Sequence, residues 1–223
     1  MFISIFMTKS VISIGPEADI TEASALMQHH RFRHLPVTLE DDRLIGIVSD
    51  RDIRSAMPSK YFHEAEGLDY EHGRMTGILV QDIMTKDPVT ISSGSTIQDA
   101  LLLIEKARVG AFPVVDESLR LLGIISDRDL LNAFIQMLGI REPGVLLGIV
   151  VDEHPSEMEH IVGAIISENI TMGSLLVARN WRPGKRAVFP YLLAKNVSNL
   201  KQKFLNAGYE VLDPMAWYIG RGD

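Results

Sequence analysis

The chain has 223 residues, of which 46% are hydrophobic and 23% charged, and its formal net charge is -7 at pH 7. These proportions describe a folded globular protein, and the acidic balance argues against general nucleic-acid binding through phosphate neutralisation. The chain has no cysteine, which excludes disulfides, thiolate metal ligands and a cysteine nucleophile. No apolar run reaches the roughly 18 residues that span a bilayer, and no basic leader opens the sequence, so we expect a cytoplasmic protein without membrane contact.

An internal duplication occupies the first part of the chain. A shift of 77 residues aligns 7–54 with 84–131 without a gap, and 19 of the 48 aligned pairs are identical. The longest shared stretches are Gly46–Asp52 and Gly123–Asp129, which read Gly-Ile-Val-Ser-Asp-Arg-Asp and Gly-Ile-Ile-Ser-Asp-Arg-Asp. Self-similarity of this kind predicts two copies of one structural unit.

Each copy predicts the order strand, helix, strand, strand, helix. Apolar residues three or four apart indicate the helices, and short apolar runs between polar turns indicate the strands. Because a unit of this size buries little surface alone, we expect the copies to pack sheet against sheet around a shared core. The first copy predicts Val11–Ile14, Ile20–Met27, Leu35–Thr38, Leu44–Val48 and a helix starting at Ser49. The second predicts Val89–Ile91, Ile97–Ile104, Phe112–Val115, Leu121–Ile125 and a helix starting at Ser126.

The paired motifs resemble cystathionine-β-synthase (CBS) domains. They are the Met-Thr start of each copy, the segments His34–Val37 and Ala111–Val114, and the two Ser-Asp-Arg-Asp stretches. The resemblance divides the chain into a first repeat at 1–57, a connector at 58–78 and a second repeat at 79–140. It implies a Bateman module, a pair of repeats that binds adenine nucleotides or related adenosyl ligands in clefts between them. Such pairs act as sensors rather than catalysts, and they commonly form homodimers.

The shared Ser-x-x-Asp element has two interpretations. In the first, Ser49 and Ser126 are helix N-caps, and Asp52 and Asp129 complete capping boxes. In the second, which the resemblance implies, the carboxylates accept hydrogen bonds from a ribose diol and the serine hydroxyls contact the sugar or phosphate. An ionised carboxylate suits a vicinal diol because it has two acceptor oxygens and no donor. Capping by the serine is compatible with sugar binding.

The two copies differ in their basic residues. Where the first copy has Arg33 and His34, the second has Gly110 and Ala111. The resemblance places these positions near phosphates, so it implies two unequal clefts. The first would prefer a phosphorylated ligand, and the second would bind more weakly or take an uncharged adenosyl group. The alternative is that Arg33 and His34 lie on a solvated strand edge.

Each predicted nucleotide site takes residues from both copies. Arg51 and Arg128, one residue before each aspartate, are further phosphate ligands or else members of surface ion pairs. The first site comprises Arg33, His34, Ser49, Arg51, Asp52, Thr85, Val89, Val109, Gly110 and Ala111. The second site comprises Thr8, Ile12, Phe32, Ser126, Arg128 and Asp129.

Residues 144–223 follow a different pattern. The predicted order is strand, helix, strand, strand, helix, strand, the split arrangement of ferredoxin-like folds. Placed after a CBS pair, this part resembles an ACT domain, and the whole chain resembles the acetoin-utilisation CBS–ACT proteins. The fold class is therefore α+β. The expected elements are Val145–Val151, Pro155–Glu168, Ser174–Ala178, Ala187–Ala194, Asn196–Ala207 and Tyr209–Leu212.

The first loop of this part, Asp152–Ser156, lacks the glycine that amino-acid-binding ACT domains place after the proline. Two alternatives stay open, namely amino-acid sensing and a ligand-free dimerisation or docking module. Asp152 and Ser156 are candidate helix caps. The histidines and acids of the connector 58–78 match no metal-ligand spacing, so we predict no metal site there. The tail Met215–Asp223 is expected to cover an exposed sheet edge.

Together these features predict an adenine-nucleotide-binding regulatory protein with no catalytic residue and no required cofactor. The regulatory ligand is expected to be AMP, ADP, ATP or S-adenosylmethionine, and its binding is expected to shift conformation or assembly. The alternative from another class is a ligand-free structural or interaction module. An enzyme is disfavoured because the sequence offers no nucleophile–base pair, metal cluster or phosphate-cradling glycine loop.

Overall fold

A computed structural model describes residues 1–56 and 77–212. The chain divides into two compact units, Met1–Leu131 and Asn132–Asp223. The tail prediction, and all of the connector prediction except residues 77 and 78, lie outside the described residues.

The first unit contains two three-stranded sheets, one built around the hairpin of each repeat. The strands of the first unit are β1 (His34–Thr38), β2 (Leu44–Ser49), β3 (Thr85–Lys86), β4 (Ile91–Ser92), β5 (Ala111–Val115) and β6 (Leu121–Ser126). Its helices are η1 (Ile3–Ile5), α1 (Ile20–His30), α2 (Asp50–Ala56), α4 (Val80–Ile83), α5 (Ile97–Ala107) and the start of α6 (Asp127–Leu138). One sheet has the order β1-β2-β3 and the other β4-β5-β6. The hairpins β1–β2 and β5–β6 share one register, since His34 lies opposite Ser49 and Ala111 opposite Ser126.

The Met-Thr start of each repeat joins the sheet of the other repeat. Thr85 in β3 pairs with Ile47 in β2, and Thr8 forms a bridge with Ile124 in β6. The Thr8 bridge has two backbone hydrogen bonds, of 2.9 and 3.0 Å. The two repeats are therefore exchanged at their first segments, an arrangement that local sequence patterns did not predict.

The prediction of a first strand at Val11–Ile14 was wrong. Only Ile14 forms a β-bridge, parallel to Val37 at the β1 edge of this sheet, and residues 11–13 join no strand. In the second repeat the predicted strand Val89–Ile91 is shifted to Ile91–Ser92, and Val89 is exposed.

The helices before the central hairpins begin and end at defined caps. Asp19 accepts a 2.7 Å hydrogen bond from the Thr21 amide at the start of α1, and Thr96 and Asp99 form a capping box on α5. Both helices end in a left-handed residue, Arg31 at φ 59° and Arg108 at φ 53°. These arginines occupy equivalent positions in the two repeats, immediately before the hairpin strands.

The interior of the first unit is apolar and is formed by the inner faces of helices and hairpins. One cluster of the first repeat surrounds α1 and β1–β2, while Phe112 and Ile125 are fully buried in the second repeat. Burial of this surface is the main stabilising term for so small a unit. The buried members of the first cluster are Ile14, Ala23, Met27, Leu35, Val37, Val48, Ile53 and Val80.

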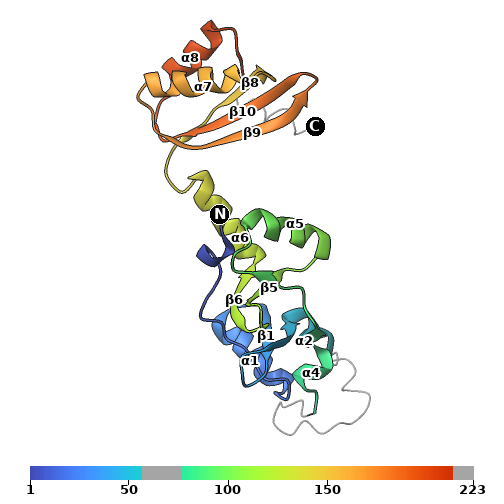
Figure 1. Cartoon of the computed structure of the whole chain (residues 1–223). Coiled ribbons are helices and arrows are strands. Elements are labelled where there is room, and N and C mark those ends of the chain that lie inside the picture. Colours follow the sequence, from blue (N-terminus) through green and yellow to red (C-terminus); the bar gives the residue numbers. More distant parts are fainter. Residues whose placement is uncertain (57–76, 213–223) are drawn as a thin grey trace, which may run out of the picture. The chain divides into compact units, whose positions relative to one another are not determined.

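The second unit follows the predicted order of elements. These are β7 (Val145–Leu146), β8 (Gly148–Asp152), α7 (Ser156–Ser167), β9 (Met172–Arg182), β10 (Lys185–Leu192), α8 (Ser198–Asn206) and β11 (Glu210–Leu212). The sheet is antiparallel, with β11 on β8, β8 on β10 and β10 on β9. Helices α7 and α8 cover one face of this sheet, where Ile161, Ile165 and Phe204 pack on Ile149 and Val188 (Figure 1).

The predicted strand Val145–Val151 is divided into β7 and β8. Both pair with β10 in one continuous register, since Leu146 lies opposite Tyr191 and Ile149 opposite Val188. The interruption falls opposite Pro190, which has no backbone N–H to donate to the ladder.

The predicted capping of α7 by Asp152 or Ser156 was wrong. The N-cap residue is Pro155, whose side chain makes no cap, and the Ser156 amide at the start of α7 donates to Nδ1 of His154 at 3.3 Å. The Asp152 carboxylate instead forms an ion pair with Lys185, its cross-strand partner, at 2.7 Å. The Ser156 hydroxyl lies 2.6 Å from Nδ1 of His154.

Candidate functional site

A cleft of about 1070 Å³ lies between the two repeats of the first unit. Every residue of both predicted nucleotide sites lines it. The residues of the first site are Arg33, His34, Ser49, Arg51, Asp52, Thr85, Val89, Val109, Gly110 and Ala111, and those of the second are Thr8, Ile12, Phe32, Ser126, Arg128 and Asp129. The two predicted sites are thus halves of one continuous hollow.

Both Ser-x-x-Asp elements form capping boxes with matching geometry. The Ser49 amide and hydroxyl donate to Oδ2 of Asp52 at 2.9 and 2.7 Å, and the Asp52 amide donates to the Ser49 hydroxyl at 3.3 Å. Ser126 and Asp129 repeat all three distances. The capping interpretation is confirmed. It occupies one carboxylate oxygen, and within the described residues Oδ1 of each aspartate accepts no hydrogen bond, so it remains an acceptor for a sugar hydroxyl.

The exchanged segments bring Thr85 and Thr8 into the cleft. Thr85 pairs with Ile47, two residues before Ser49, while Thr8 pairs with Ile124, two residues before Ser126. Each serine therefore lies beside a threonine from the start of the other repeat. Both threonines are exposed at the cleft and carry a hydroxyl that donates and accepts.

His34 makes the two halves of the cleft unequal. Its half-buried imidazole lies against Gly110, where a Cβ atom would be 3.1 Å from Cε1 and 3.3 Å from Nε2 of the ring. Burial lowers the pKa of His34, and the carboxylates of Asp127, Asp50 and Asp52 partly oppose this shift. The ring is therefore mainly neutral at neutral pH, and it gains a proton more readily if an anion enters the cleft.

Several arginines line the cleft without an ion-pair partner among the described residues. Arg54, which pairs with Asp50 at 3.1 Å, lies on α2 outside the cleft lining. The surface-ion-pair interpretation of Arg51 and Arg128 is therefore not supported within residues 1–56 and 77–212. The arginines of the cleft are Arg31, Arg33, Arg51, Arg108 and Arg128.

Arg31 and Arg108 are cleft residues that the sequence-based site prediction omitted. The duplication carried the signal, because these two arginines are identical at aligned positions. Only the left-handed ends of α1 and α5 show how they turn toward the hairpins. Within the described residues, the cleft thus combines carboxylate oxygens that accept no hydrogen bond with guanidinium groups that form no ion pair, which suit a sugar diol and a phosphate respectively.

A family model for the CBS domain matches this chain twice, at residues 3–59 and 80–136. The chain belongs to the CBS-domain family. The cleft described above lies between its two CBS repeats, and both repeats line it. Within the described residues, no group of three or more histidine, aspartate or glutamate side chains is arranged to hold a metal ion, and no helix is long and apolar enough to cross a membrane.

Curated relatives match the CBS repeats. An inosine-5'-monophosphate dehydrogenase from Korarchaeum cryptofilum is 36% identical over 124 residues, which are 56% of this chain and 22% of that enzyme. A CBS domain-containing protein from Dictyostelium discoideum is 33% identical over 132 residues, 59% of this chain and 90% of that protein. The chain therefore spans about a fifth of the dehydrogenase and most of the Dictyostelium protein.

Solved structures with this fold include CBSX2, a CBS-pair protein of Arabidopsis thaliana, in complex with AMP. It is 26% identical with a TM-score of 0.50, and the match covers 60% of this chain and 96% of CBSX2. The AcuB protein of Vibrio cholerae shares the fold at 23% identity and a TM-score of 0.51, covering 63% of this chain and 96% of AcuB.

Proposed function

We propose that the CBS pair of this protein is a regulatory module that binds an adenine nucleotide in the cleft between its repeats. The observation that carries the proposal is the single cleft that gathers two open aspartate oxygens and five arginines without ion-pair partners in the described chain. The AMP complex of CBSX2, which shares this fold, supports an adenosyl ligand.

The first half of the cleft is the stronger candidate for a phosphorylated ligand. Asp52 accepts the ribose hydroxyls through Oδ1, while Arg33, Arg51 and His34 meet the phosphate. Because each phosphate contact is charge-assisted, these residues contribute more affinity than neutral contacts would. The adenine then lies against the second repeat, near Val109 and its neighbours.

The second half of the cleft carries less positive charge. Gly110 and Ala111 stand where the first repeat has Arg33 and His34, so the site on Asp129 has no counterpart of that pair, although Arg128 precedes the aspartate. A ligand there is held mainly through its ribose and base. This half binds AMP more weakly than the first or takes an uncharged adenosyl group such as adenosine.

The regulatory output follows from a ligand that contacts both repeats. A nucleotide stabilises whichever relative arrangement of the repeats gives it the better contacts, and the population shifts by its differential affinity. The exchanged residues Thr8 and Thr85 are suited to this role because they belong to one repeat and pair with the other. CBS pairs are generally regulatory, so we assign no catalytic step.

We further propose an ACT-like fold for the second unit, as in acetoin-utilisation CBS–ACT proteins. Its strand order β11-β8-β10-β9 and its two helices on one face support this assignment. The β8–α7 loop is engaged internally, since Arg186 donates to the carbonyls of Asp152 and His154 at 3.4 and 2.8 Å. We therefore favour a docking or homodimerisation role over amino-acid sensing at this loop, in a cytoplasmic protein.

A thermal-shift panel tests the nucleotide proposal. AMP, ADP, ATP, S-adenosylmethionine, adenosine and inorganic phosphate are each added at 1 mM to the full chain. A ligand that binds only the folded state raises the melting temperature. At 100 times its Kd it adds about 2.7 kcal/mol to the free energy of unfolding. We expect a larger shift with AMP than with adenosine or phosphate. No shift with any adenosyl compound would favour a ligand-free scaffold.

A further inference from the structure

A second hollow, of about 1000 Å³, lies in the second unit between α7, α8 and the end of β8. Its floor contains the buried side chains Val151 and Phe204, and small residues keep it open. A Cβ atom built on Gly163 or on Gly208 meets no atom within 4 Å. We call this hollow the helix groove. It shares no residue with the nucleotide cleft.

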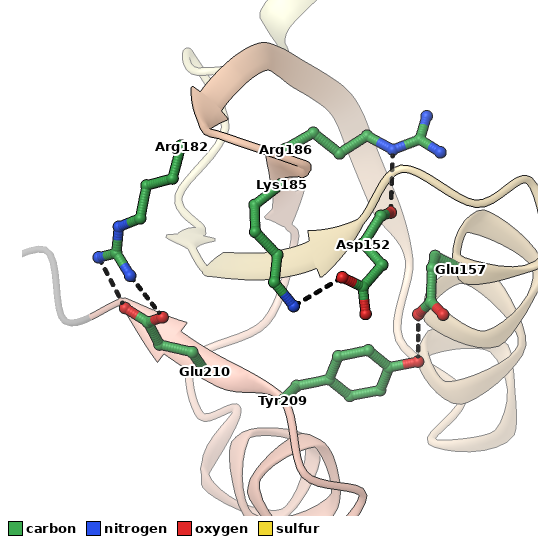
Figure 2. Close-up of polar contacts among 7 residues, drawn as sticks. All are labelled: Asp152, Glu157, Arg182, Lys185, Arg186, Tyr209 and Glu210. Carbon is green, nitrogen blue, oxygen red and sulfur yellow. Dashed lines mark hydrogen bonds and ion pairs between the residues drawn. The ribbon is translucent and has the colours of Figure 1, made fainter.

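The lysine and arginine side chains that line the helix groove are already paired, and Figure 2 shows two of these pairs, those of Arg182 and Lys185. Arg182 donates two hydrogen bonds to Glu210 at 2.9 and 3.0 Å. Lys185 lies 2.7 Å from Asp152. The third, Lys203, is 3.1 Å from Glu168. An incoming carboxylate or phosphate would therefore have to displace an existing partner.

Glu157 is the exception among the charged groups of the helix groove. It has no ion pair within the described residues, and its contact is the Tyr209 hydroxyl, which donates to Oε2 at 2.7 Å (Figure 2). Burial and the adjacent Glu157 carboxylate raise the pKa of Tyr209 to about 12, so the phenol stays a donor and does not neutralise the carboxylate. Oε1 of Glu157 accepts no hydrogen bond among these residues.

We propose that the helix groove binds an aliphatic amine, with its ammonium group on Glu157 and its carbon chain over Val151 and Phe204. The uncompensated carboxylate supplies the charge complement for a cation. The apolar floor suits an alkyl chain, and Gly163 leaves the room for it. Because Arg182, Lys185 and Lys203 are paired, the carboxylate of an amino acid would have to displace one of their partners. The other basic side chain of the groove, His160, has its Nδ1 atom 3.5 Å from the Tyr209 hydroxyl. The groove therefore favours an amine over an amino acid. The proposal does not depend on the nucleotide site.

Glu157 also has a simpler possible role, which a neighbouring residue can separate from ligand binding. An acidic residue in the first turn of α7 stabilises the helix through its favourable interaction with the helix dipole. Glu159 occupies the same turn as Glu157. Glu159 is exposed and does not line the helix groove. Glu159→Gln therefore makes the same charge change on the same helix, without touching the groove.

The test is calorimetric titration of the full chain with pentylamine and with norleucine. The two probes share the amino group and the carbon chain, and only norleucine carries a carboxylate. We expect pentylamine to bind at least about tenfold more tightly than norleucine, and Glu157→Gln to weaken pentylamine by about tenfold or more, as for one charge-assisted hydrogen bond. Glu159→Gln should leave the affinity unchanged.

A second variant keeps the test independent of Glu157. Gly163→Leu places a side chain in the helix groove from an open helical position, so α7 should persist by circular dichroism while pentylamine binding is lost. The proposal is overturned if pentylamine does not bind the wild type, if norleucine binds as tightly, or if Glu159→Gln weakens binding as much as Glu157→Gln. AMP affinity should not change in any of these variants.

Discussion

The imidazole of His34 lies against Gly110, so close that a Cβ atom on the glycine would be 3.1 Å from Cε1 and the ring would have to shift. This contact joins the one histidine among the predicted phosphate ligands to Gly110, which stands in the second repeat where the first has Arg33. The cleft is asymmetric at this point. The asymmetry determines which half of the cleft should take a phosphate.

Substitution of Gly110 tests the His34 contact directly. Gly110→Val would place atoms within 3.1 Å of Cε1, so we expect the imidazole to be displaced and AMP affinity to fall about tenfold, the loss of one charged contact. Gly15→Val is the control, because a Cβ atom there meets nothing within 4 Å. Isothermal titration calorimetry gives both affinities. Equal AMP affinity in Gly110→Val and wild type would remove His34 from the phosphate site.

Binding of AMP should be accompanied by proton uptake at His34. Burial lowers the pKa of the free imidazole below its ordinary value, and a phosphate beside it raises that pKa again. Affinity should therefore increase as the pH falls from about 8 toward 6.5, the ordinary histidine pKa. Titrations in buffers of different ionisation enthalpy measure the uptake. His34→Gln should reduce it, and an unchanged uptake in that variant would contradict the assignment.

The same shift has a consequence for the unliganded protein. Since the pKa of His34 is lower in the folded state, the unfolded chain binds more protons below about pH 6.5. The contribution of His34 to stability is present above that pH and is lost as the pH falls through the lowered pKa. Chemical denaturation at pH 7.5 and 5.5 should show a smaller loss of unfolding free energy in His34→Gln than in wild type. An equal loss in both proteins would contradict the shift.

The exchange of the Met-Thr segments depends on a glycine in each sheet. A Cβ atom on Gly123 would lie 2.7 Å from Sδ of Met7 and 2.9 Å from the Thr8 carbonyl oxygen. Gly123→Ala should destabilise the first unit by about 1–3 kcal/mol, as for overpacking. Adding Met7→Ala should restore part of the loss, because the sulfur contact is relieved and the carbonyl contact is not. Denaturant midpoints measure both, and a fully additive double variant would argue against this contact.

The two repeats could be predicted from the sequence because segments with 19 identical aligned residues adopt the same fold. Ser49 and Asp52 were placed correctly as a capping box, since three-residue spacing is a local property. The predicted strand Val11–Ile14 is reduced to one bridge, between Ile14 and Val37, and the pairing of Thr85 with Ile47 was not predicted, because both depend on residues distant in the sequence. Long-range pairing of this kind leaves no mark on local periodicity.

Long-range contacts also explain which side-chain roles could not be predicted from the sequence. Asp152 was expected to cap the following helix, but Lys185 from a distant strand pairs with it instead. Arg31 and Arg108 were missed although the duplication showed them, because their direction depends on the left-handed ends of two helices. Residue types and spacing therefore identified the groups, and tertiary contacts decided which of them face the cleft.

The most direct test of the nucleotide proposal is calorimetric titration of AMP into wild type, Asp52→Asn, Asp129→Asn and Asp99→Asn. Asp99 forms an equivalent capping box outside the cleft, so its variant controls for the loss of a cap. Loss of a charge-assisted bond of about 1.5–3 kcal/mol predicts roughly 10- to 100-fold weaker AMP binding in Asp52→Asn, a smaller effect in Asp129→Asn and none in Asp99→Asn. Wild-type affinity in Asp52→Asn, or an equal loss in Asp99→Asn, would contradict nucleotide binding at this cleft.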